Sequence, residues 1–412
     1  MRIAPTCPAL LPAIAGLFAG TAAACPFCAA PSLTLSEQVG QADVAVIGAY
    51  DEATEATADS SASSTFLKID TLRGDAPHEI TVPSYRSADP GDLFLLLASN
   101  EEPSDDTPEA GQTLRWSGPV EITEAAARYI KQTPPLDAPQ IERLGFFLKF
   151  LEHDDQTVAT DAYSEFAGAP YDAVVPLSDQ MPVEKLRKWI TDGQVTPTRL
   201  GLYGMMLGLC GEESDADLMF GVITKKTDEF RLGIDGIMGG YMLLTGEQGL
   251  EKIEKRVLLS RDVPFNETYA AMQALRFLWK YTEGAVPKPR LKQSMRLLLE
   301  RPDLADLVIA DLARWKDWSL IPSLDSYYDR EGYEVPAIKR AIIRFYLTAE
   351  ATDVEPPSEE QREAATKKLA DLKDRDPKTF RDAKRFFFLP QATPKKDDSK
   401  TDDSDTAKTD DA

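Results

Sequence analysis

RLGLYGMMLG at residues 199–208 returns as RLGIDGIMGG at residues 231–240, and this repetition decides the fold. The two stretches start 32 residues apart and share the pattern R-L-G-x-x-G-x-M-x-G. A third Arg-Leu-Gly, at residues 143–145, opens a predicted helix that runs through Phe150. Periods of about 30–45 residues with two helices in each unit are typical of α-solenoids. The repetition therefore predicts an array of paired helices.

The glycines of the first copy need a separate interpretation. Gly201, Gly204, Gly208 and Gly211 are spaced by three, four and three residues, which places them along one face of a helix. Each glycine costs a helix about 1 kcal/mol relative to alanine. The close approach of a neighbouring helix backbone would compensate for this cost, so we interpret the glycines as packing residues. A ligand groove is the alternative.

The helical array is expected to span residues 138–389, in about five or six pairs. Apolar residues recur at helical spacing in residues 155–177 and 305–324, and Pro322 is placed to open the partner helix of the second stretch. Residues 359–374 have the pattern of a charged amphipathic helix. These segments favour repeated helix pairs throughout the second part of the chain.

The end of the chain divides into two parts. Phe386-Phe387-Phe388-Leu389 ends a predicted helix over residues 380–389, and we expect this cluster to dock that helix and close the array. Residues 391–412 are almost all Asp, Lys, Thr, Ser and Ala. Such a composition buries too little apolar surface to offset the entropy of ordering, which predicts a disordered acidic tail.

A different pattern precedes the helices. Residues 32–43 predict a short helix, and short apolar or alternating runs bounded by turn residues follow it. They predict strands at residues 44–50, 65–72, 79–83 and 92–98, with a fifth around residues 114–122. Five short strands indicate a small barrel or sandwich, so residues 25–134 are predicted to form a small β domain.

The first 24 residues have the layout of a secretory signal peptide. Met1-Arg2 supply a positive charge, residues 9–24 are apolar and small, and Ala22-Ala23-Ala24 precedes Cys25. No later stretch approaches the roughly 18–20 apolar residues of a membrane helix. We therefore expect cleavage and a secreted or periplasmic protein. A lipoprotein is the less favoured alternative, because Ala22 stands where lipidation signals have leucine.

Cys25 and Cys28 form a Cys-Pro-Phe-Cys motif at the expected new amino terminus. Export makes a structural disulfide between them the favoured interpretation. Thiol redox chemistry and half of a zinc site stay open, although no strand precedes the motif and zinc needs two more ligands. Cys210, on an apolar helix, is expected to be buried as a small apolar residue.

Two resemblances extend this interpretation. Residues 138–350 resemble HEAT/armadillo-like repeat proteins, which implies an α-solenoid. CPFC at residues 25–28, RLGLYGMMLGLCG at 199–211 and LADLVIADLARWKDW at 304–318 resemble a group of exported bacterial proteins that join this motif to such repeats. Residues 25–122 also resemble netrin-like, OB-type barrels, in which a cysteine-containing amino terminus precedes five strands. That last resemblance implies a metalloprotease-inhibitor module.

Charge and composition exclude several functions. The chain has a formal net charge of −22. Nucleic-acid binding relies on clustered Lys and Arg, so we expect no nucleic-acid partner. Only two histidines occur, His78 and His153, and no nucleophile elbow, zinc-binding, phosphate-loop or calcium-loop motif is present. We therefore expect no catalytic residue, no metal and no cofactor.

Three further sets of residues have structural interpretations. Asp161 and Glu165 are like charges on one helix face and repel each other. Asp311 lies on an apolar helix, and Arg314 is placed to form an ion pair with it. Trp315 and Trp318 are interpreted as core residues, with a carbohydrate platform as the alternative.

The sequence predicts an exported, non-enzymatic scaffold whose helical surface binds a protein or peptide. A thiol–disulfide protein that uses Cys25 and Cys28 is one alternative. A netrin-like inhibitor is another.

Overall fold

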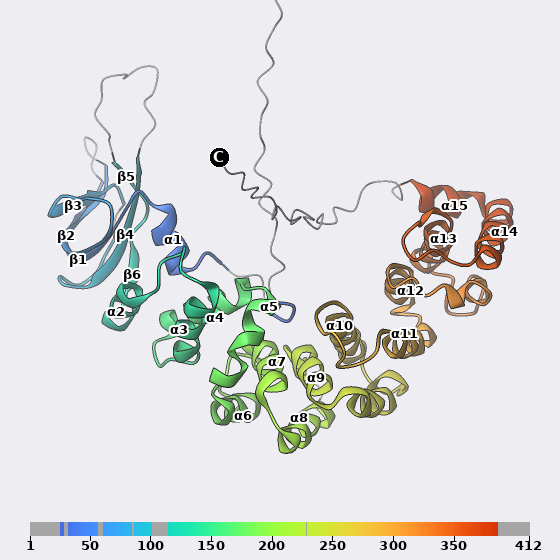
Figure 1. The fold of residues 1–412 in the computed structure, drawn as a ribbon. Coiled ribbons are helices and arrows are strands. Elements are labelled where there is room, and N and C mark those ends of the chain that lie inside the picture. The colour runs from blue at the N-terminus through green and yellow to red at the C-terminus, as the bar shows by residue number, and fades with distance from the viewer. Residues whose placement is uncertain are drawn as a thin grey trace, which may run out of the picture.

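The computed structural model describes residues 25–28, 32–56, 61–84, 86–100, 114–227 and 229–385. The predicted signal peptide, the cluster at residues 386–389 and the acidic tail lie outside these ranges. The described chain is mainly helical, with a small antiparallel sheet near its amino-terminal end. The helices follow one another along an arc, with the sheet at one end and α13, α14 and α15 at the other (Figure 1).

The sheet has the order β3-β2-β1-β4-β5, and β6 also pairs with β4. Its strands are β1 (Val44–Thr54), β2 (Ser63–Arg73), β3 (Glu79–Val82), β4 (Leu93–Asn100), β5 (Leu114–Trp116) and β6 (Val120–Ile122). The first four predicted strands are confirmed. The predicted fifth strand is instead two short strands, because Gly118-Pro119 interrupts it and proline has no N–H to donate to a ladder.

The two faces of the sheet serve different cores. Along β4, Phe94 and Leu96 face a core formed within the sheet, where the Phe94 ring lies 5.1 Å from that of Phe66. Leu95, between them, belongs to the core shared with the helices, together with Ile130 of α2. This alternation follows from the two-residue period of a strand. One face of the sheet is therefore closed by its own side chains, and the other packs on the helical part.

Short helix α1 (Leu35–Gln41) precedes the sheet, and the remaining helices follow it. They are α2 (Glu124–Gln132), α3 (Gln140–Phe147), α4 (Gln156–Gly168), α5 (Tyr171–Val174), α6 (Val183–Thr191), α7 (Leu200–Cys210), α8 (Glu213–Thr224), α9 (Ile234–Ile253), α10 (Phe265–Tyr281), α11 (Lys288–Leu297), α12 (Ala305–Arg314), α13 (Pro336–Ala351), α14 (Glu359–Arg375) and α15 (Pro377–Lys384). Several begin at polar caps: Thr34, Thr123, Asp155 and Ser358 accept from backbone N–H groups of the first turn.

Helices α7 and α9 carry the two copies of the repeated stretch, and they pack backbone against backbone. A Cβ atom on Gly204 would lie 2.6 Å from the Cα of Ile237. A Cβ on Gly208 would overlap Gly240 in the same way. Only glycine fits at these positions, so the interpretation of Gly204 and Gly208 as packing residues is confirmed. Gly211 follows the end of α7 and does not belong to this face.

Some helix boundaries differ from the prediction. Pro322 does not open an α-helix; short 3₁₀ turns at Trp318–Leu320 and Leu324–Tyr327 stand there instead. Pro322 has no N–H to donate, and the hydroxyls of Ser323 and Ser326 donate to nearby carbonyls, which favours turns over a helix. Helix α3 begins at Gln140, ahead of the Arg-Leu-Gly that was expected to open it.

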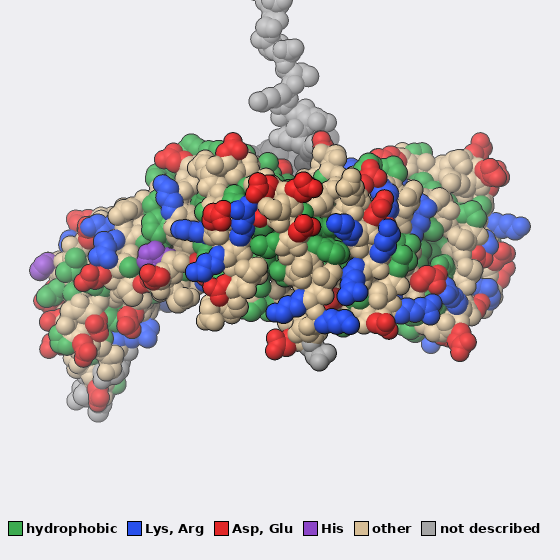
Figure 2. All heavy atoms as spheres, turned by 90° about the horizontal axis from the view of Figure 1, so that it is seen from below, with side chains coloured by type: hydrophobic (Ala, Val, Ile, Leu, Met, Phe, Trp, Pro, Cys, Tyr) green, Lys and Arg blue, Asp and Glu red, His purple; other side chains and the backbone are tan. Residues whose placement is uncertain are grey.

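Positive and negative side chains are interspersed on one face of the molecule (Figure 2). The face seen from below the arc shows Lys and Arg side chains among Asp and Glu side chains along its length (Figure 2). The helices that the structure describes include none that is long and apolar enough to cross a membrane.

Candidate functional site

The Cys-Pro-Phe-Cys motif forms a closed turn. A disulfide joins Cys25 and Cys28, whose Cα atoms are 5.4 Å apart. The N–H of Cys28 also donates to the carbonyl of Cys25, over 3.4 Å. These residues start no helix, so the helix terminus that lowers thiol pKa values in redox motifs is missing from this turn.

This turn docks on the helices, although the sequence grouped it with the β domain. The N–H of Cys25 donates to the carbonyl of Ala167, in the last turn of α4, over 3.0 Å. The Phe27 side chain is only 7% exposed, and its ring centroid lies 4.7 Å from that of Phe277 on α10. This turn therefore ties α4 to α10.

Two glycines shape the position that Phe27 occupies. A Cβ on Gly201 of α7 would lie 2.7 Å from the carbonyl oxygen of Phe27, and one on Gly239 of α9 would lie 2.6 Å from its Cζ. We call the surface formed by Ala167, Gly201, Gly239 and Phe277 the Phe27 socket. The two copies of the repeated stretch thus pack α7 on α9 and also receive the Cys25–Cys28 turn.

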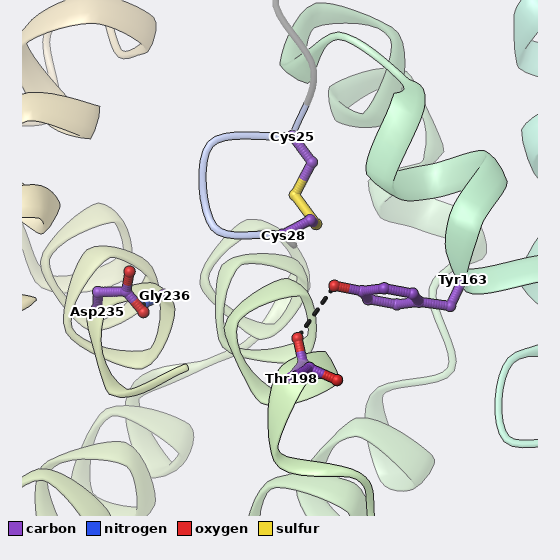
Figure 3. The surroundings of a disulfide bond; sticks show 6 residues. All are labelled: Cys25, Cys28, Tyr163, Thr198, Asp235 and Gly236. Atoms are coloured by element: carbon purple, nitrogen blue, oxygen red, sulfur yellow. Dashed lines mark hydrogen bonds between the residues drawn. A yellow bond between two sulfur atoms is a disulfide. The ribbon is translucent and has the colours of Figure 1, made fainter. Parts of the chain in front are cut away.

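Figure 3 shows two polar arrangements in the surroundings of the disulfide, one at Tyr163 and one at Asp235. The Tyr163 hydroxyl donates to the carbonyl of Thr198 over 3.0 Å. Asp235, at the start of α9, accepts from the N–H of Gly236 over 3.0 Å, and burial raises the pKa of its carboxyl. Neither arrangement supplies a nucleophile with a base at hydrogen-bond distance, which covalent catalysis requires.

The other candidate ligands lie outside any cluster. His78 is exposed, and Nδ1 of His153 accepts from the N–H of Asp155 over 3.0 Å. Cys210 is half-buried at the end of α7, and burial raises its pKa to about 11. Within the described ranges, no three His, Cys, Asp or Glu residues are grouped so that they could hold a metal ion.

Asp161 and Glu165, which the sequence places on one helix face, each bind different partners in the structure. Asp161 accepts from the N–H of Leu35 over 2.6 Å and from the Tyr129 hydroxyl over 2.7 Å. Glu165 pairs with Arg143 over 2.9 Å. Desolvation by burial raises the pKa of Asp161 to about 6. The two acids therefore fasten α1 and α2 to α4, a role that their sequence spacing does not predict.

The remaining candidates are structural. Asp311 forms the predicted ion pair with Arg314 and a second one with Arg276 of α10, over 2.6 Å. Trp315 is 5% and Trp318 6% exposed. The Trp315 ring stacks on Trp279, with centroids 4.3 Å apart. Their burial confirms that Trp315 and Trp318 are core residues and removes the carbohydrate platform.

Sequence reasoning missed a cavity of about 640 Å³ where the sheet meets the helices. We call it the junction cavity. Its walls come from α1, from the end of β2 (Asp70–Arg73) and from residues 130–137, which join α2 to α3. These segments are far apart in the sequence, and no motif marks them.

No sequence pattern predicted the exposed apolar patch between α8 and α10. Phe230 is 68%, Leu232 44% and Phe265 47% exposed. Arg231, between the first two, pairs with Glu267 of α10 over 2.7 Å, which brings the loop that carries Phe230 and Leu232 to the helix that carries Phe265. We call these three residues the apolar patch. Alternating apolar and basic residues in a loop were the only available signal.

Comparison of the chain with models of known protein families, with curated proteins and with solved structures finds no match.

Proposed function

We propose that this protein is an exported, non-enzymatic scaffold that binds a protein or peptide partner on its helical array. The apolar patch is the observation that carries this proposal. Large apolar side chains that remain exposed in a group mark interaction surfaces more often than isolated ones do. The described residues with unusual burial or charge, Asp161 and Asp311 among them, are engaged in structural contacts instead.

On this proposal, the helical array is a HEAT-like α-solenoid. It is supported by three ion pairs that join segments 35 or 36 residues apart, whereas Arg187–Asp215 and Arg199–Glu152 join segments 28 and 47 residues apart. Arg231 bonds to Glu267, Arg276 to Asp311 and Arg290 to Glu254, at sequence separations of 36, 35 and 36 residues. On this proposal, each of the three pairs links one helical unit to the next, as in repeat proteins whose units contact their neighbours.

The small sheet is proposed to be an OB-type barrel that caps one end of the solenoid. The closed core on one face of the sheet supports this, because strands must curl to enclose Phe66, Phe94 and Ile80. A solenoid needs end units that cover its last apolar surface. The opposite face of the sheet, through Leu95 and Ile122, supplies that cover.

The partner is proposed to be a basic protein or peptide. The formal net charge of −22 attracts cationic partners over a distance and speeds their association, and it repels polyanions. We also propose that the signal peptide is cleaved before Cys25 and that the protein is secreted or periplasmic.

The test is selection of binders from a random peptide library against the immobilised full-length protein. Enriched peptides are then measured by calorimetry on the wild type, on the triple variant Phe230→Ser, Leu232→Ser, Phe265→Ser, and on a matched variant, Val335→Ser, Val354→Ser. The two control side chains are 49% and 68% exposed and lie outside the patch. We expect the selected peptides to be basic and to carry large apolar side chains. Their affinity should be at least tenfold lower for the triple variant and unchanged for the matched variant. Equal binding by all three proteins would contradict the proposal.

A thiol–disulfide function is the second candidate, favoured by the half-exposed Cys28. A reduction potential below about −300 mV identifies a structural disulfide, and one near −200 mV identifies redox work. We expect the lower value, since the turn lacks an adjoining helix terminus that stabilises a thiolate.

A further inference from the structure

We propose that the junction cavity binds a short apolar peptide or amino acid whose amino and carboxyl groups are both free. This inference does not depend on the apolar patch, which is a different surface. It rests on the size of the cavity, on its apolar walls and on two solvent-exposed charged side chains, Arg73 and Asp137, that form no ion pair with any residue the structure describes.

The size and lining of the cavity fit a small organic ligand. Its volume of about 640 Å³ lies within the range of roughly 300–1,000 Å³ found for small-molecule sites. Apolar side chains from three segments form much of the wall: Val39, Leu72, Ile130, Pro134, Pro135 and Leu136. They would cover the apolar side chain of a ligand such as leucine or a leucine dipeptide.

Four charged side chains line the cavity, and the charges of two of them offset each other. Lys131 of α2 forms an ion pair with Asp70 of β2 over 2.5 Å. This pair bridges the sheet and the helices, and it leaves Arg73 and Asp137 as the charged groups available to a ligand.

Arg73 is held in place without being neutralised. Its Nη1 donates to the carbonyl of Gly40, at the end of α1, over 2.7 Å. Neither Arg73 nor Asp137 forms an ion pair with any residue that the structure describes. A guanidinium fixed through one nitrogen keeps its other N–H groups for a carboxylate. Asp137 can accept from an ammonium group.

These charges favour a zwitterion over other ligand classes. A fatty acid would satisfy Arg73 but would leave Asp137 beside an apolar chain, and a cationic amphiphile would do the reverse. A nucleotide carries more negative charge than one guanidinium offsets. A ligand with one positive and one negative end matches the balanced lining and adds no net charge to an already acidic protein.

The position of Leu136 sets the shape of one wall. A Cβ atom on Gly40 would overlap the Leu136 side chain, so glycine at this position lets Leu136 lie against α1. The Leu136 side chain is 47% exposed. An apolar ligand would cover this surface, which adds a hydrophobic contribution of about 25 cal/mol per Å² buried.

The test is calorimetric titration of the full-length protein with L-leucyl-L-leucine. Its N-acetyl form, its C-terminal amide, its doubly blocked form and dodecanoate are titrated alongside. The variants are Arg73→Gln and Asp137→Asn. Arg115→Gln in β5 and Glu121→Gln in β6 are matched controls, because both side chains are exposed on the same sheet and lie outside the cavity. Circular dichroism of each variant confirms that it is folded.

We expect the free dipeptide to bind and each blocked form to bind roughly tenfold more weakly, as loss of one charge-assisted hydrogen bond predicts. Arg73→Gln should weaken only ligands with a free carboxylate, and Asp137→Asn only those with a free amine. The controls should bind as the wild type does. Equal affinity for the doubly blocked peptide, binding of dodecanoate alone, or no heat with any dipeptide at millimolar concentration would each overturn the proposal.

Discussion

The hydroxyl of Tyr129 donates a hydrogen bond to Oδ2 of Asp161 over 2.7 Å, across the contact between α2 and α4. The same carboxylate accepts from the N–H of Leu35, 126 residues earlier in the chain. One buried acid thus joins three helices that lie beside the sheet. Because its carboxylate is desolvated, this contact makes the stability of the fold depend on pH.

The first prediction concerns Asp161→Asn. Burial raises the pKa of Asp161 from 3.8 to about 6, so the folded protein binds more protons than the unfolded chain between these values. Its stability therefore falls as the pH rises through this range, by up to about 3 kcal/mol. Asp161→Asn should increase the free energy of unfolding at pH 7.5 by about 1–2 kcal/mol, since Asn removes the buried charge and keeps an acceptor.

Urea unfolding at pH 7.5 and pH 4 measures this difference. The gain should vanish at pH 4, where Asp161 of the folded wild type is protonated. Asp172→Asn, at an exposed acid on α5, is the control and should change little at either pH. A gain of equal size at both pH values would show that the charge of Asp161 is not the cause.

The second prediction concerns Phe27→Ala. The ring is 7% exposed and packs against Phe277, so its removal should lower the free energy of unfolding by about 3–5 kcal/mol. Phe230→Ala, at a side chain that is 68% exposed, should cost less than about 0.5 kcal/mol. Denaturant titration compares the two. Similar losses would mean that the Phe27 socket does not hold the ring in solution.

Reduction of the disulfide gives the third prediction. The Cys25–Cys28 bond closes a loop of only a few residues, for which loop entropy predicts about 2 kcal/mol of stabilisation. Differential scanning calorimetry with a dithiol reductant should therefore show a lower Tm for the wild type. The variant Cys25→Ser, Cys28→Ser should already have the lower Tm and should not respond to the reductant. A response by that variant would show that the reductant changes the Tm by a route other than reduction of this bond.

The fourth prediction contrasts two glycines. Gly208→Ala should destabilise the protein by roughly 1–3 kcal/mol or more, because the added methyl group would overlap the backbone of Gly240. Gly221 lies in α8, and a Cβ added there would meet no neighbouring atom within 4 Å, so Gly221→Ala should stabilise the helix by up to about 1 kcal/mol. Thermal unfolding of both variants checks the opposite signs. Two changes of the same sign would argue against backbone contact between α7 and α9.

Local patterns predicted much of the fold. The strands that became β1 to β4 were predicted because apolar residues alternate or cluster between turn residues. Helix α14 was predicted from its charged amphipathic period and matches residues 359–375 closely. The glycine face of α7 was predicted because four glycines in one helix need a compensating contact. The disulfide followed from the spacing of two cysteines and an expected export signal.

The candidate sites were predicted less well, because their residues come from distant segments. The spacing of Asp161 and Glu165 suggested mutual repulsion. In the fold, Asp161 accepts hydrogen bonds from Leu35 and Tyr129, and Glu165 pairs with Arg143. The prediction that Pro322 opens a helix was wrong. A proline can start a helix or a turn, and a side-chain hydrogen bond of the nearby Ser326 favours the turn.

By itself the sequence determined most of the segments that are strands or helices, and it determined where two helices must approach without side chains between them. Those properties depend on neighbours within a few turns, where periodicity and glycine placement act directly. The tertiary structure alone decided that Phe27 lies against Phe277, that Arg73 and Asp137 share one cavity, and that the amino-terminal turn docks on helices. Contacts of this kind join residues tens to hundreds of positions apart, and no local spacing encodes which of many compatible surfaces will meet.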